Sequence, residues 1–121
     1  MSEHTLRDHR ILVVEDEYLL AAALRSKLQD RGAVVLGPVS NLDDALALIR
    51  SEALIEGAVL DISLGSQKSF PAADLLMARD IPFVFTTGYD DSAIPGPYGN
   101  IPTLQKPFDI AKIVQALSRA L

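Results

Sequence analysis

The segment Ile11-Leu12-Val13-Val14-Glu15-Asp16-Glu17 is the most informative about the fold, because a continuous apolar run ends abruptly in carboxylates. An uninterrupted apolar run of this length is typical of a strand buried on both faces, as the strands of parallel sheets are. Further short runs of this kind follow at residues 33–36, 58–60, 82–86 and 104–105. We therefore expect a sheet whose strands are deeply buried.

Apolar side chains at helical spacing occupy the segments between these runs. The stripes are Leu20, Ala23, Leu24 and Leu28; Leu42, Ala45, Leu46 and Ile49; residues 72–79, with Pro71 near the start; and Ile110, Ile113, Val114 and Leu117. Gly32 is a candidate helix C-cap, and Ser40 with Asp43 resembles a capping box. We expect Gly37 and Pro38 to end the second strand. The alternation of strands and helices predicts an α/β fold: a doubly wound parallel sheet with helices on both faces.

Prolines and glycines interrupt this alternation where a fourth helix would run. They are Pro95, Gly96, Pro97, Gly99 and Pro102. An interior proline costs a helix about 3 kcal/mol, so the fourth helix is expected to be short, distorted or absent. We also expect few apolar anchors between residues 90 and 101.

Length and composition are those of one ordinary domain, with 121 residues of which 49% are hydrophobic. We expect a single domain over 1–121 that begins with a polar tail over 1–9. The net charge of −5 argues against a nucleic-acid partner, because phosphate backbones require clustered Lys and Arg. The chain has no cysteine, and none of its apolar runs approaches the length of a membrane span. A cytoplasmic protein without a membrane partner is expected.

Polar residues stand at the carboxyl ends of the predicted strands, where open α/β sheets place their sites. They are Glu15, Asp16, Asp61, Thr87 and Lys106. Converging carboxylates repel one another, by about 4 kcal/mol for a close pair, so a cation is needed, and Mg²⁺ prefers such oxygen ligands. Lys106 would add a second positive charge, Asp61 could attack phosphorus as a nucleophile, and Thr87 could donate to a phosphoryl oxygen.

Each of these residues also has a purely structural interpretation. An acidic pair can serve a helix N-terminus, an aspartate can sit in a turn, a threonine suits a strand end, and a lysine suits the surface. The occurrence of all of them, in order, at successive strand ends favours the functional interpretation.

The motifs Ile11–Glu17, Ala58-Val59-Leu60-Asp61, Thr86-Thr87-Gly88 and Gln105-Lys106-Pro107-Phe108 resemble those of response regulator receiver domains over essentially the whole chain. The resemblance implies a CheY-like, flavodoxin-like (βα)₅ fold and phosphorylation of Asp61. It implies that Asp16 binds Mg²⁺ directly, Glu15 through water and Ser63 through its carbonyl. Thr87 and Lys106 would contact the phosphoryl group, and the Lys106–Pro107 bond would be cis. The implied partners are a histidine kinase or a phosphotransfer protein and an unknown downstream protein.

The chain departs from ordinary receivers at the aromatic residue that takes part in their conformational switch. Thr103 occupies the position of the usual aromatic residue, three positions before Lys106. Together with the irregular fourth helix, the segment Phe85-Thr86-Thr87-Gly88-Tyr89 resembles the FAT GUY subgroup of receivers, with Thr86 in place of the alanine. Tyr89 is the first aromatic residue after Thr87, so it is expected either to relay the switch or to shield the phosphoryl group and set its lifetime.

The expected function is therefore a receiver that accepts a phosphoryl group on Asp61 and signals by protein contact or onward transfer, not an enzyme acting on other substrates. One alternative is a degenerate receiver that never takes phosphate. A phosphatase with Asp61 as nucleophile would need a second acid two residues later, where this chain has Ser63. A flavodoxin-like phosphate binder would need a glycine- or hydroxyl-rich first loop, whereas Glu15, Asp16 and Glu17 would repel phosphate.

Overall fold

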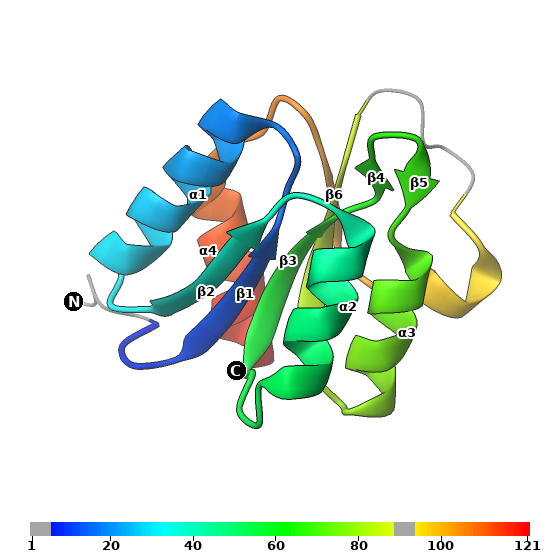
Figure 1. Cartoon of the computed structure of the whole chain (residues 1–121). Helices are drawn as coiled ribbons and strands as arrows, with labels where there is room; N and C mark the ends of the chain where they lie inside the picture. The colour runs from blue at the N-terminus through cyan, green and yellow to red at the C-terminus, as the bar shows by residue number, and fades with distance from the viewer. Residues whose placement is uncertain (1–5, 89–93) are drawn as a thin grey trace.

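A five-stranded parallel sheet forms the centre of the molecule in the computed structural model, which describes residues 6–88 and 94–121 (Figure 1). The strand order is β2-β1-β3-β6-β7, and every neighbouring pair is parallel. The strands are β1 (Arg10–Val14), β2 (Val34–Val39), β3 (Gly57–Asp61), β6 (Phe83–Thr87) and β7 (Thr103–Gln105). This arrangement confirms the predicted doubly wound sheet.

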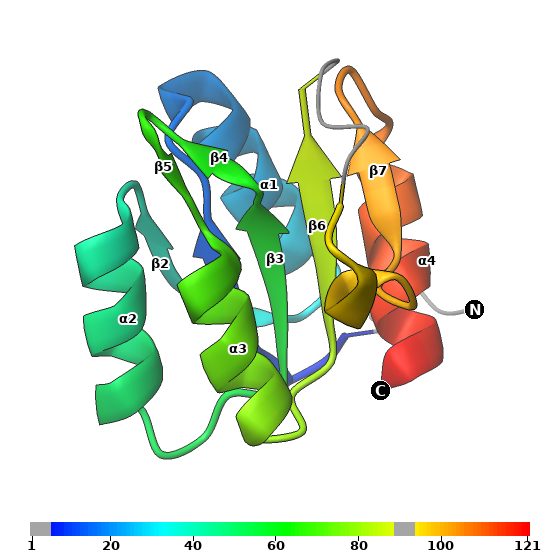
Figure 2. The ribbon, with the colours of Figure 1, turned by 90° about the vertical axis from the view of Figure 1, so that its right-hand side faces the viewer.

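Helices cover both faces of the sheet (Figure 2). On one face lie α1 (Tyr18–Asp30) and α4 (Ile110–Ala120), and on the other lie α2 (Leu42–Ser51) and α3 (Phe70–Ala78). Side chains of β1 alternate between the two cores: Ile11 and Val13 pack toward α1 and α4, and Leu12 and Val14 toward α2 and α3. Because both faces are covered, the apolar run is continuous rather than alternating with polar residues.

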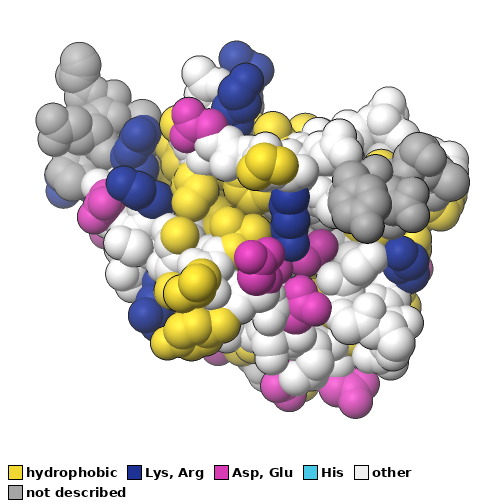
Figure 3. Space-filling view, turned by 90° about the horizontal axis from the view of Figure 1, so that it is seen from above, with side chains coloured by type: hydrophobic (Ala, Val, Ile, Leu, Met, Phe, Trp, Pro, Cys, Tyr) yellow, Lys and Arg dark blue, Asp and Glu magenta, His cyan; other side chains and the backbone are white. Residues whose placement is uncertain are grey.

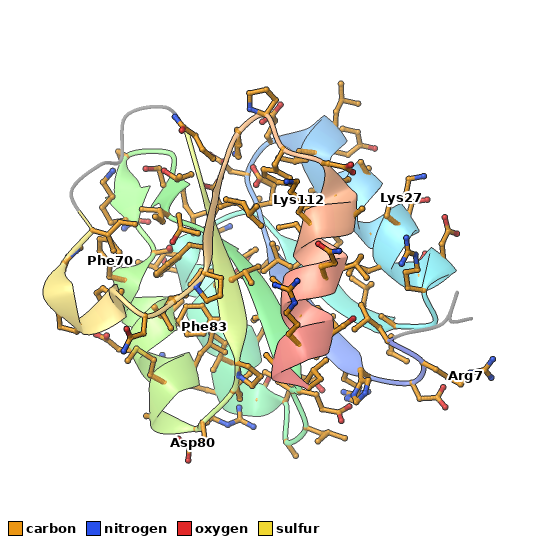
Figure 4. All side chains as sticks on the ribbon, turned by 180° about the vertical axis from the view of Figure 1, so that it is seen from behind. Arg7, Lys27, Phe70, Asp80, Phe83 and Lys112 are labelled. Atoms are coloured by element: carbon orange, nitrogen blue, oxygen red, sulfur yellow. The ribbon has the colours of Figure 1, made fainter. Side chains whose placement is uncertain are left out.

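A single 3₁₀ turn, η1 (Gly96–Tyr98), stands where a fourth helix would run, in agreement with the prediction that this helix is short, distorted or absent. The expectation of few apolar anchors here is wrong. The ring of Tyr98 stacks on Phe70 at a centroid distance of 4.8 Å and meets Phe85 edge-on at 5.9 Å. Its hydroxyl donates to Asp74 Oδ1 of α3 at 2.5 Å. Figure 4 shows Phe70 beside this turn. The buried side chain of Tyr98 therefore fixes the turn to α3.

The second strand and the helix that follows it differ in detail from the prediction. β2 does not stop at Gly37 and Pro38 but runs through them to Val39. β2 is an edge strand, where a residue without an N–H is tolerated. The cap of α2 is Asn41, whose side chain accepts from the backbone N–H of Asp44 at 2.8 Å, and not Ser40.

The described part of the predicted tail, residues 6–9, packs on the domain. Leu6 is fully buried in the core beneath α1 and α4, and its N–H donates to the carbonyl of Arg31 at 3.0 Å. One apolar side chain in an otherwise polar stretch is therefore enough to anchor it. Within the described ranges, no helix combines the length and the apolar character needed to cross a bilayer.

A small antiparallel hairpin, which the sequence did not predict, stands between β3 and α3. Its strands are β4 (Ser63–Leu64) and β5 (Gln67–Lys68), with Ser63 opposite Lys68. Gly65 makes the turn with a φ of +63°, a conformation that favours glycine. The hairpin rises at the carboxyl end of the sheet (Figures 1 and 2).

Candidate functional site

Three carboxylates converge at the carboxyl ends of the central strand β3 and its neighbour β1. Glu15 and Asp16 follow β1, and Asp61 ends β3, whose Leu60 pairs with Val14. One oxygen from each of the three lies within 4.8 Å of the others. Glu15 and Asp61 are buried, with 1% and 2% of their surfaces exposed, whereas Asp16 is exposed. Figure 3, which views the molecule from above, shows acidic side chains near the middle of the face.

Lys106, the residue directly after β7, reaches into this cluster. Its Nζ donates to Asp61 Oδ2 at 2.9 Å and to Glu15 Oε2 at 3.0 Å, and lies 3.8 Å from Glu17 Oε1. Burial alone lowers the pKa of Lys106, but the hydrogen bonds and charges of Asp61 and Glu15 outweigh it, so the net pKa is raised. The ammonium group therefore stays charged at neutral pH.

Glu15 has the most perturbed ionisation in the site. Burial, followed by the negative charge of Asp61, raises its pKa to about 7, although the N–H of Glu17 and the ammonium of Lys106 act in the opposite direction. Its Oε1 is buried and has no hydrogen-bond partner among the residues that the structure describes. A buried carboxylate oxygen without a donor, beside two more carboxylates, fits a hard divalent cation that takes oxygen ligands.

Thr87 ends β6, directly beside β3, and its surface is 6% exposed. Its hydroxyl donates to the carbonyl of Gly88 at 3.1 Å, and its own carbonyl accepts from the N–H of Lys106 at 2.7 Å. The structure therefore brings together the carboxylates, Thr87 and Lys106 that the sequence singled out. The preceding residue, Thr86, pairs with Asp61 and buries its hydroxyl without a partner among the described residues.

The hairpin contributes further contacts to the carboxylates. The N–H of Ser63 donates to Asp61 Oδ1 at 3.2 Å, and the N–H of Gly65 donates to Asp16 Oδ2 at 2.9 Å. Lys68 Nζ donates to the hydroxyl of Ser63 at 2.9 Å. Sequence reasoning singled out Ser63 but missed Gly65 and Lys68.

Of the two residues predicted to tune the switch, only Thr103 is among the described residues, and it does not lie in the site. Thr103 begins β7 opposite Phe85, is exposed, and donates from its hydroxyl to the carbonyl of Ile101 at 3.2 Å. Tyr89 lies outside the described residues, so its role stays a prediction. The Lys106–Pro107 bond is cis, as the resemblance implied.

Comparison with known proteins gives several close likenesses, although no protein-family model matches the chain. The solution structure of SdrG from Sphingomonas melonis Fr1 is 39% identical, with a TM-score of 0.81 over 93% of this chain and 96% of SdrG. A response regulator receiver protein from Sinorhizobium medicae is 27% identical, with a TM-score of 0.80 over 95% of both chains. A Burkholderia pseudomallei response regulator that carries a phosphorylated aspartic acid and a calcium ion is 29% identical, with a TM-score of 0.76 over 91% of this chain and 66% of that one.

Among curated proteins, the phyllosphere-induced regulator PhyR of Methylorubrum extorquens is 33% identical over 115 residues, which are 92% of this chain. The chain spans only 43% of the length of PhyR.

The sheet, its two helical layers and the acidic site at its carboxyl edge define an α/β domain of the flavodoxin-like class. Within that class, and together with these relatives, the chain belongs to the receiver domains of response regulators.

Proposed function

We propose that this receiver accepts a phosphoryl group on Asp61 and passes the signal on by protein contact or by onward phosphotransfer. The observation that carries the proposal is the position of Asp61: it is buried at the end of β3, with Oδ2 held 2.9 Å from Lys106 Nζ. The phosphorylated aspartic acid of the Burkholderia pseudomallei response regulator supports it as a property of a similar protein.

The chemistry follows from the side chains. One carboxylate oxygen of Asp61 forms a bond to the donor's phosphorus as the donor's own bond to phosphorus breaks, and the electron pair leaves with the donor. Such transfer depends mainly on positioning and charge neutralisation. Lys106 is placed to neutralise a phosphoryl oxygen, and the hydroxyl of Thr87, one strand away, can donate to another.

The acidic cluster would hold Mg²⁺ through Glu15, Asp16, Asp61 and the carbonyl of Ser63. The orphaned Oε1 of Glu15 and the grouping of its neighbours support this assignment. When bound, the ion would supply positive charge that offsets the carboxylates and the incoming phosphoryl oxygens.

The proposed phosphodonor is a cytoplasmic histidine kinase or phosphotransfer protein. The surface beside Asp61 suits a protein partner, because Tyr18 and Leu19 at the start of α1 are 81% and 77% exposed. Next to them lies a hollow of about 450 Å³ lined by Glu17, Leu20, Gly88, Lys106, Pro107 and Phe108. Figure 3 shows hydrophobic side chains gathered in a depression on this face. Membership of the FAT GUY subgroup is also proposed, on the residues Phe85-Thr86-Thr87-Gly88 and the single turn η1.

Intact mass spectrometry after incubation with phosphoramidate and Mg²⁺ tests the proposal. The wild type should gain one phosphoryl group, and Asp61→Asn should gain none. Asp43→Asn, which changes an exposed carboxylate in the first turn of α2, is the matched control and should label normally. Equal labelling of wild type and Asp61→Asn would refute Asp61 as the acceptor.

A further inference from the structure

The β4–β5 hairpin brings a second lysine to the acceptor aspartate. Antiparallel pairing sets Lys68 opposite Ser63, and Lys68 Nζ donates to Ser63 Oγ at 2.9 Å. The N–H of the same serine donates to Asp61 Oδ1 at 3.2 Å. One residue, Ser63, therefore connects the ammonium group of Lys68 to the carboxylate of Asp61.

The two lysines are associated with different oxygens of Asp61. Lys106 contacts Oδ2 directly, whereas Lys68 is linked through Ser63 to Oδ1. The hairpin is also tied down at its tip, because the N–H of Gly65 donates to Asp16 Oδ2 at 2.9 Å. With base and tip bonded to two of the clustered carboxylates, the hairpin holds Lys68 at the rim of the site, where its side chain is exposed.

The charges of the site indicate a role for Lys68. The three clustered carboxylates carry three negative charges against the single positive charge of Lys106, and a divalent ion would bring the group close to neutral. A phosphoryl group on Asp61 replaces a single negative charge by roughly two at neutral pH. The phosphorylated site is therefore left with an excess negative charge, and a further cation within reach of its oxygens would be attracted to it.

We propose that Lys68 is a second phosphoryl-binding residue, which exchanges its hydrogen bond to Ser63 Oγ for one to a phosphoryl oxygen on Asp61. The inference rests on the proposed function. The lysine stem is long and flexible, so the exchange requires only a change of rotamer while the hairpin backbone stays in place.

Binding of beryllofluoride, a phosphoryl mimic, in the presence of Mg²⁺ tests this proposal. We expect Lys68→Gln to bind beryllofluoride about fivefold more weakly, as loss of one partly exposed charged hydrogen bond implies. Lys68→Arg should recover most of the affinity. Lys27→Gln is the matched control, because it removes the same charge from an exposed position on α1, away from the hairpin (Figure 4). Mg²⁺ affinity without beryllofluoride should not fall in Lys68→Gln, because a positive charge leaves an acidic site.

Unchanged beryllofluoride affinity in Lys68→Gln would overturn the role of Lys68, and so would an equal loss in Lys27→Gln, which would reflect net charge alone. Failure of the wild type to bind beryllofluoride, together with failure of Asp61 to label with phosphoramidate, would instead overturn the proposed function on which the inference rests. The two failures are therefore distinguishable.

Discussion

Lys106 is shared between two acidic side chains, and this sharing defines its electrostatic role. Its ammonium group lies 3.0 Å from Glu15 Oε2 and 2.9 Å from Asp61 Oδ2, on the carboxylates proposed to bind metal. A lysine at this position should weaken the binding of a metal ion, because both cations are attracted to the same carboxylates. It should strengthen the binding of a phosphoryl group, which is negatively charged.

Replacement of Lys106 should therefore separate the two binding events. We expect Lys106→Met to bind Mg²⁺ about tenfold more tightly, equivalent to roughly 1.4 kcal/mol, and to take phosphate from phosphoramidate more slowly. Metal titration and intact mass measure the two effects. Lys112→Met, on the exposed side of α4 (Figure 4), is the control and should change neither. Weaker Mg²⁺ binding in Lys106→Met would contradict the competition.

Asp16 and Glu15 are neighbours with different environments, and their variants should differ. Asp16 is exposed, whereas Glu15 is buried and bonded to Lys106. We expect Asp16→Asn to weaken Mg²⁺ binding more than Glu15→Gln, since the proposed direct ligand loses a coordination bond and the other only a water-mediated contact. The reverse order in metal titrations would mean that the two roles are exchanged.

The site residues that could be predicted are those that end strands. Asp61, Thr87 and Lys106 each follow an apolar run, and the parallel sheet brings such ends together whatever lies between them. The contacts of Gly65 and Lys68 could not be predicted in this way. Gly65 meets Asp16 across 49 positions of sequence, and nothing in the local pattern indicates that pairing.

At the scale of elements, short segments were harder to predict than long ones. β4 and β5 have two residues each and include polar side chains, so they lack the alternation that identifies a strand. β2 was predicted to end early because Pro38 stops most central strands, and only the strand order shows that β2 lies at an edge. For η1, the prolines predicted the loss of the helix but not the burial of Tyr98.

The Tyr98–Asp74 hydrogen bond should stabilise η1 against α3. We expect Tyr98→Phe to lower the free energy of unfolding by about 1 kcal/mol, because the hydroxyl contact is lost while the ring stays packed. Tyr98→Ala should cost roughly 3 kcal/mol, because the stacked ring is lost as well. Urea unfolding measures both. Tyr18→Phe, at a side chain that is 81% exposed, is the control, and a comparable loss there would contradict a specific role for Tyr98.

The contribution of the same hydrogen bond to stability should depend on pH. The hydrogen bond to Asp74, followed by burial, raises the pKa of Tyr98 from 10.0 to about 12. Because the pKa is raised in the folded state, the stabilisation by the Tyr98–Asp74 hydrogen bond is complete below pH 10 and is lost as the pH rises toward 12. The stability difference between wild type and Tyr98→Phe should therefore shrink over that interval, and a difference that stays constant would refute this origin.

At the scale of the whole molecule, the acidic site should link metal binding to folding. The carboxylates of Glu15, Asp16 and Asp61 are brought together only when β1 and β3 pair, so Mg²⁺ should bind the folded chain selectively. We expect a stabilisation of about 2.7 kcal/mol at a Mg²⁺ concentration one hundred times the dissociation constant. Chemical unfolding with and without the ion measures it. Asp16→Asn should lose most of this effect, and equal stabilisation in that variant would place the bound metal elsewhere.

The two outer strands of the sheet have a consequence for self-association. An exposed strand edge can act as a template for a strand of another molecule, which is one route to aggregation. Here the edge strand β2 contains Pro38, which has no N–H to donate, and the opposite edge strand, β7, is only three residues long. Neither edge offers a long, regular row of donors and acceptors. Both edges of the valine- and leucine-rich sheet therefore give a strand of a second molecule little regular backbone to pair with.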